Sequence, residues 1–174
     1  MRPNWKNWLA GVAVLLLALS AVAQHKTSGV QSNASFDKMK TLAGDWDGEV
    51  REGGETLPAR VVVRVVSDGS AIMHELDPGG PHNMVTMIHP DGPALLATHY
   101  CAAHNQPRMK LKPSSDANSL LFDFMDGTNI TPGSGHMQSV KFVFVDADHH
   151  YEDWSYSDNG KVSTTRFDFH RKKS

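Results

Sequence analysis

The sequence predicts an all-β protein, an antiparallel up-and-down β-barrel of about ten strands with a short N-terminal helix. The first observation is that short runs of alternating apolar and polar residues recur at even spacing. The second is that turn dipeptides such as Asp68-Gly69 and Asn159-Gly160 separate these runs, and such dipeptides are strong hairpin signals. The third is the lack of a long helical period between the runs. Consecutive hairpins form a meander, which closes into a barrel and thereby removes exposed sheet edges.

Ten segments carry the strand pattern: 45–52, 59–67, 70–76, 83–89, 94–101, 107–112, 119–125, 137–145, 150–156 and 161–170. Alternation places Phe167 and Phe169 on one face of the last segment and Asp168 and His170 on the other, outer face. Segment 59–67 is apolar on both faces, so its facing stays open.

The N-terminal residues predict an export signal and a leader. Residues 1–23 combine early positive charge, an apolar run and small residues before Gln24, which is typical of a secretory signal peptide. The alternative is a retained membrane anchor, but the apolar run is shorter than the ~20 residues that a spanning helix needs. Residues 24–34 are polar and predict a flexible leader, and residues 35–172 then form the barrel domain. We expect an exported protein, periplasmic or secreted, with no stable membrane anchor after cleavage.

Composition limits the chemistry. The net charge is -2 and no basic stripe is present, which argues against a nucleic-acid binder. Cys101 is the only cysteine, which excludes an intramolecular disulfide and a cysteine-based zinc site, and we expect it to be buried. The chain has 10 histidines, but His149 and His150 are adjacent and point to opposite faces of a strand. The sequence therefore predicts no specific metal site. The acidic residues from Asp146 to Asp153, Glu152 among them, predict a solvated turn.

The start of the barrel domain carries a recognisable pattern. Ser35 is expected to cap a short helix with Asp37 in its first turn, and Gly44 is expected to stop it. Residues 42–48 then lead into the first strand through a Gly-x-Trp motif around Trp46. This opening resembles the calycin superfamily, which includes lipocalins, fatty-acid-binding proteins and nitrobindin-like barrels.

The resemblance implies roles for two residues. In the calycin superfamily a tryptophan lies across the closed end of the barrel and an arginine of the last strand packs on it, which assigns these places to Trp46 and Arg171. The alternative is that Trp46 is a core aromatic without wider meaning. The wider layout of the chain also resembles an uncharacterised bacterial lipocalin-like family, with Trp46 and residues 99–101 and 105–107 in comparable places.

Residues 98–109 are the most unusual stretch, because they gather polar and aromatic groups around one turn. One interpretation is a polar patch that orients a ligand, since ligand pockets combine apolar walls with a few placed polar groups. The other is a tight turn in which Asn105 and Gln106 satisfy loop backbone and His99 is a hydrogen-bonded core residue.

We expect the barrel to bind a small, mostly apolar molecule and to need no cofactor. The candidate ligand-binding residues are Glu75, His99, Gln106, Met109, Phe122, Phe124 and Trp154, with Trp46 supplying further surface. Three alternatives remain open. A nitrobindin-like barrel holds haem through a late histidine, but the only late histidine, His170, is predicted to face outward. An enzyme would use the same cavity and carry a perturbed titratable residue, His99 or Glu75 first. A structural domain would have a packed interior.

Overall fold

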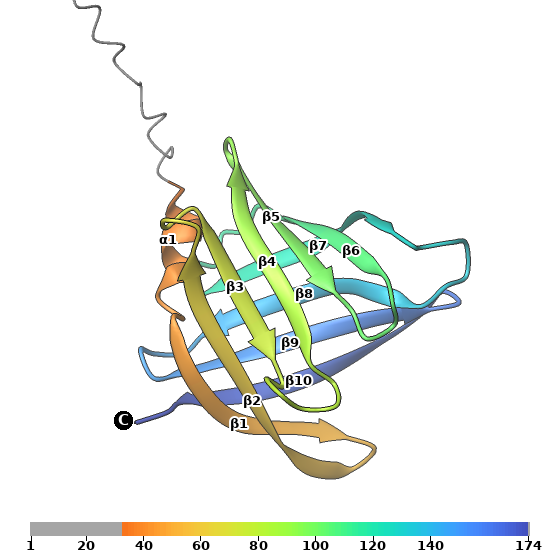
Figure 1. The fold of residues 1–174 in the computed structure, drawn as a ribbon, viewed down its shortest axis with the longest axis horizontal. Coiled ribbons are helices and arrows are strands. Elements are labelled where there is room, and N and C mark those ends of the chain that lie inside the picture. The colour runs from red at the N-terminus through yellow and green to blue at the C-terminus, as the bar shows by residue number, and fades with distance from the viewer. Residues whose placement is uncertain (1–32, 174) are drawn as a thin grey trace, which may run out of the picture.

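The computed structural model describes residues 33–173 and confirms the fold class. The described chain forms a closed barrel of ten antiparallel strands and one short helix, α1, Ala34–Lys40 (Figure 1). The predicted signal peptide and all of the predicted leader except Asn33 and Ala34 lie outside the described residues. The strands are β1 Gly44–Glu52, β2 Glu55–Val66, β3 Ala71–Leu76, β4 Met84–Asp91, β5 Ala94–Tyr100, β6 Gln106–Leu111, β7 Ser119–Thr128, β8 His136–Phe144, β9 His149–Asp158 and β10 Lys161–Arg171.

Each strand pairs with its neighbours in the chain, and the pairing of β1 with β10 closes the barrel. In that last pairing Trp46 lies opposite Arg171 and Val50 lies opposite Phe167. The contact between the two strands is close at Gly48, where an added Cβ would clash with the backbone oxygen of Asp168. Glycine at this position therefore allows the first and last strands to approach each other.

Charged partners on the outer face settle the facing of β2, which the sequence left open. Arg60 and Arg64 point outward, where they pair with Asp45 and Glu75. Val61 and Val63, which lie between these two arginines in the chain, point inward and are buried in the core.

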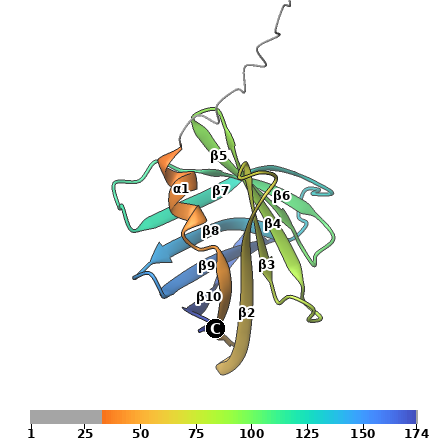
Figure 2. The same cartoon turned by 60° about the vertical axis from the view of Figure 1, so that its left-hand side comes forward.

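Asn33, rather than the expected Ser35, is the N-cap of α1. Its side-chain oxygen accepts a hydrogen bond from the Phe36 backbone amide at 3.0 Å, so the helix begins earlier in the chain than predicted. The Asn33 amide also donates to the Ala94 carbonyl, which ties the helix start to the β4–β5 hairpin. Phe36 and Met39 of α1 are buried in the core. The helix itself lies at this end of the barrel (Figure 2).

Arg171 and Trp46 join the helix to the closed end. Trp46 is fully buried, and its indole N–H donates to the Leu42 carbonyl at 2.8 Å. The Arg171 guanidinium lies 4.1 Å from the Trp46 ring. It also donates to the carbonyls of Thr41, Ala43 and Ala147. One cation therefore satisfies carbonyls after the helix and in the β8–β9 turn while it stacks on the indole.

Cys101 is half-buried, whereas the sequence predicts a buried residue. This partial burial raises the pKa of its thiol, and a backbone hydrogen bond at Ala103 opposes the rise.

Within residues 33–173, no helix has the length and apolar character required to cross a membrane.

We predict that Arg171→Lys lowers the free energy of unfolding by about 2 kcal/mol, because lysine cannot donate to three carbonyls in a planar fork. Denaturant unfolding monitored by circular dichroism measures the change. Arg51→Lys, at an exposed arginine, is the matched control and is expected to leave stability unchanged. Equal stability of the two variants would contradict the structural role given to Arg171.

Candidate functional site

The barrel contains a cavity of about 420 Å³ at the end away from α1. Its walls come from the ends of the strands that meet there, and they include Val50, Leu76, Met84, Met137, Trp154 and Phe167. His82, Asp77 and Tyr156 also line it. The helix end of the barrel is instead filled by buried side chains. The cavity therefore lies at the end of the barrel opposite the one that α1 packs against.

A fully buried carboxylate lies in the interior beneath the cavity wall. Glu152 accepts hydrogen bonds from His74 Nε2 at 2.9 Å and from His150 Nε2 at 3.1 Å. Its second oxygen accepts from the Trp154 indole N–H at 2.8 Å. We call these four residues the Glu152 cluster. A buried carboxylate is costly unless it is paired and hydrogen-bonded, and here three side chains meet that need.

The surroundings of Glu152 favour its charged form. Burial alone would raise the pKa of this carboxyl, but the positive charge of His74 and the hydrogen bonds from His150 and His74 outweigh burial. The net pKa of Glu152 therefore lies well below its ordinary value. A carboxylate held in this way is a fixed internal anion rather than a base poised to accept a proton.

His99 also packs against the Trp154 ring, with the two ring centroids 4.9 Å apart. Its Nδ1 forms a 2.8 Å hydrogen bond with the Thr86 hydroxyl, while its Nε2 has no partner. Burial, and then the charge of His74, lower the pKa of His99 to about 3. The imidazole is therefore neutral at physiological pH. Its position agrees with the hydrogen-bonded core interpretation, and its unpartnered nitrogen keeps a polar atom inside the barrel.

The structure brings some of the predicted site residues together and separates others. Trp154 lines the cavity, and Met109 and Phe122 are buried in the core with it. Phe124 is half-buried and packs against His136, with ring centroids 4.5 Å apart.

Two predicted polar contacts lie elsewhere. The Glu75 carboxylate is on the outer face, where it accepts from Arg64 and Asn83. Gln106 accepts a hydrogen bond from Asn129 at an exposed position, while the neighbouring Asn105 donates to the Gly135 carbonyl. These contacts fit the turn-forming interpretation of residues 98–109.

The expectation that Glu152 belongs to a solvated turn is wrong, because Glu152 is fully buried. A signal for its position was present in the sequence. On a strand, His150, Glu152 and Trp154 share one face, and the tryptophan marks that face as inner. His74 could have been found in the same way, since it lies between Ile72 and Leu76 on the inner face of β3.

His170 faces outward, as alternation predicts, and its side chain is 67% exposed. The histidines that are fully buried in the described chain are His74, His99 and His150.

No family model matches the sequence, and no curated protein matches it. Solved structures match the fold. A protein of unknown function from Nostoc punctiforme, of the DUF3598 family, aligns with a TM-score of 0.55 and 12% identity over 77% of this chain. The match covers 48% of that protein, so the chain spans about half its length. Rv2717c from M. tuberculosis aligns with a TM-score of 0.55 and 12% identity, covering 82% of this chain and 100% of that one. At such identity these likenesses show the fold alone, a barrel that agrees coarsely with a calycin-like architecture.

We predict that acid destabilises the protein through His99. The unfolded histidine takes up a proton near its ordinary pKa of about 6.5, whereas the folded one resists protonation until about pH 3. Stability from this group is complete above pH 6.5 and falls as the pH decreases toward 3, by at most about 1.4 kcal/mol per pH unit.

The variant His99→Asn keeps an acceptor near Thr86 and removes the titration, so its unfolding free energy should fall less steeply between pH 6 and pH 4. His89→Asn, at an exposed histidine, is the control. If the free energy of unfolding falls equally steeply with decreasing pH in wild type and His99→Asn, the titration of His99 does not cause the acid destabilisation.

We also predict that Glu152→Gln costs about 3 kcal/mol of stability, because the amide cannot accept hydrogen bonds from His74, His150 and Trp154 together and leaves buried donors unsatisfied. Thermal and denaturant unfolding measure the loss. Glu49→Gln, at a half-exposed carboxylate of the outer face, should change stability little. A Glu152→Gln variant as stable as wild type would mean that the carboxylate charge is not needed.

Proposed function

We propose that this protein is an exported carrier that holds a small, mostly apolar molecule in the open half of a calycin-like barrel. The single observation that carries the proposal is the cavity. Its volume of about 420 Å³ falls within the range of small-molecule pockets, and apolar and aromatic side chains form most of its wall. Export rests on the signal-peptide pattern of residues 1–23.

The wall of the cavity is fixed by the interior beneath it. Trp154 presents its ring to the cavity and anchors its indole N–H on Glu152. Glu152 is in turn held by His74 and His150, on β3 and β9. Because a preformed site spends little binding energy on ordering its own side chains, this support favours affinity for a rigid apolar ligand.

Polar groups at the rim supply orientation. Tyr156 and His82 line the cavity beside the apolar wall, and the Asp77 carboxylate there accepts from the His82 backbone amide. A ligand with one polar end would place that end toward these groups and its apolar body against Trp154 and Phe167. The burial of apolar area, at about 25 cal/mol per Å², would supply most of the affinity.

The perturbed groups support a carrier better than an enzyme. Glu152 and His99 have lowered pKa values, which is the property expected of catalytic groups. Neither residue lines the cavity, however, and the carboxylate oxygens of Glu152 already accept hydrogen bonds from three side chains. Haem ligation is less well supported, because the late histidine His170 is on the outer face.

The cavity can be filled without removing a core side chain. Thr165 lines it from β10, so Thr165→Trp places a large ring in the space that the ligand would occupy. We predict that this variant weakens binding of the neutral fluorescent probe N-phenyl-1-naphthylamine at least about ten-fold by excluding it. Fluorescence titration of the purified protein measures the dissociation constant.

Val162→Trp is the matched control, because Val162 is on the same strand and is 60% exposed. It adds the same ring outside the cavity and should bind the probe as wild type does. No saturable binding to wild type, or equal binding by the two variants, would overturn the proposal. Native mass spectrometry of the protein as purified then identifies a co-purifying ligand by its mass.

A further inference from the structure

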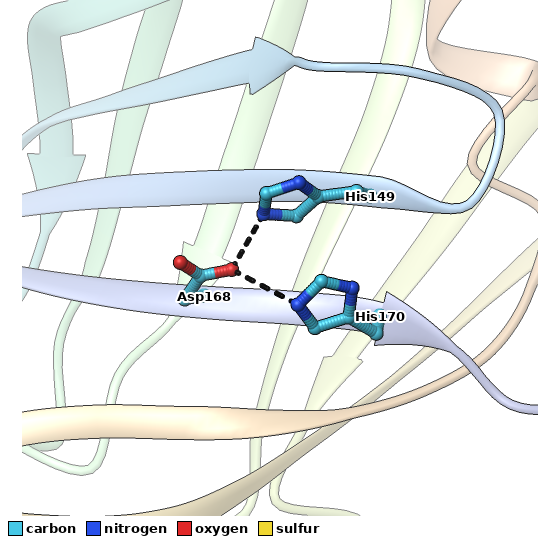
Figure 3. A group of neighbouring side chains, drawn as sticks. All are labelled: His149, Asp168 and His170. Carbon is cyan, nitrogen blue, oxygen red and sulfur yellow. Dashed lines mark hydrogen bonds and ion pairs between the residues drawn. The ribbon is translucent and has the colours of Figure 1, made fainter.

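The outer face of the barrel carries a second polar group, which the cavity does not use. His149 on β9 lies directly opposite His170 on β10, and Asp168 precedes His170 by two residues on the same face (Figure 3). His149 Nε2 is 2.8 Å from Asp168 Oδ1, and His170 Nε2 is 3.8 Å from the same oxygen. We call these three residues the outer histidine site.

The three side chains offer converging ligand atoms. One nitrogen from each histidine and one carboxylate oxygen all lie within 4.8 Å of one another. The imidazole rings stack, with centroids 4.3 Å apart and an angle of 18° between their planes. Asp168 and His170 are 43% and 67% exposed. Water and dissolved ions can therefore reach the site.

The charged groups around the outer histidine site are largely paired with one another. On the neighbouring strand β1, Asp47 lies opposite His170 and Glu49 lies opposite Asp168. Lys172 faces Asp47, Arg51 faces Glu49 and Arg166 pairs with Asp153. The ion-pair partners of Asp168 in the described chain are instead the two histidines, so this carboxylate can contribute its charge to a cation that the imidazoles bind.

We propose that the outer histidine site binds a late first-row divalent cation, zinc or copper, through His149, His170 and Asp168. Imidazole nitrogen suits these metals, whereas magnesium and calcium prefer sites made only of oxygen ligands. Three protein ligands leave a position for water, which gives a four-coordinate zinc ion. The ion joins β9 to β10 near the end of the chain.

The test is titration of the full-length, metal-free protein with Zn²⁺ alone in a calorimeter at pH 7.5. We expect one saturable site per chain. The single variants His149→Ala, His170→Ala and Asp168→Asn should each raise the dissociation constant about ten-fold or more, since even the loss of an outer-sphere partner costs that much. His89→Ala, an exposed histidine remote in the pairing pattern, is the matched control and should bind as wild type does.

A spectroscopic readout separates a defined site from scattered binding. Cu²⁺ added at one equivalent should give an electron paramagnetic resonance spectrum with coupling to two imidazole nitrogens, and coupling to one nitrogen in either alanine variant. Circular dichroism checks that the variants are folded. The proposal fails if wild type shows no saturable zinc binding, or if the double variant His149→Ala/His170→Ala binds as tightly as wild type. Both outcomes are independent of probe binding in the cavity, which is on the other side of the barrel wall.

Discussion

The pairing of β1 with β10 is the contact on which the rest of the structure depends. It joins the first strand to the last and removes the two edges that a ten-stranded meander would otherwise expose. Arg171 fixes this seam at one end, because it stacks on Trp46 of β1 and satisfies carbonyls on both sides of it. Gly48 allows the strands to approach closely along the seam. Closure, rather than any single packing contact, is what creates an interior.

The interior is unequal along the barrel axis, because side chains of α1 pack into one end of the barrel. At the helix end Phe36, Met39 and Trp46 fill the space under α1. At the other end the wall combines large residues such as Trp154 and Phe167 with small ones such as Ala59 and Thr165, and a cavity remains. The Glu152 cluster lies inside the barrel and holds Trp154, which forms part of the cavity wall. A charged carboxylate inside a protein core is stable only when several donors surround it. Because these donors come from β3 and β9, the Glu152 cluster also restricts how the strands can pack.

Most of the fold could be predicted from the sequence, because its determinants are local. Turn dipeptides and alternation gave all ten strands to within a few residues, and the resemblance around Trp46 pointed to Arg171 as its partner. The largest differences are at the ends of elements, where β2 begins at Glu55 and α1 is capped by Asn33. Backbone pairing and a competing cap residue decide those positions, and neither leaves a periodic signal.

The polar sites could be predicted less well, because they are made by contacts between strands that are distant in sequence. Glu152 meets His74 across 78 residues, and alternation can indicate that both face inward but not that they touch. His149 was correctly separated from His150 by alternation, yet its real neighbour is His170 on the next strand. A search for metal ligands along one strand misses such a pair, because the register of β9 with β10 brings the two imidazoles together. Successive residues of β9 thus have different roles. His150 holds the internal anion, and His149 faces the solvent beside Asp168. The two-residue period of a barrel wall is what allows one strand to support an internal cavity and an external polar site at the same time.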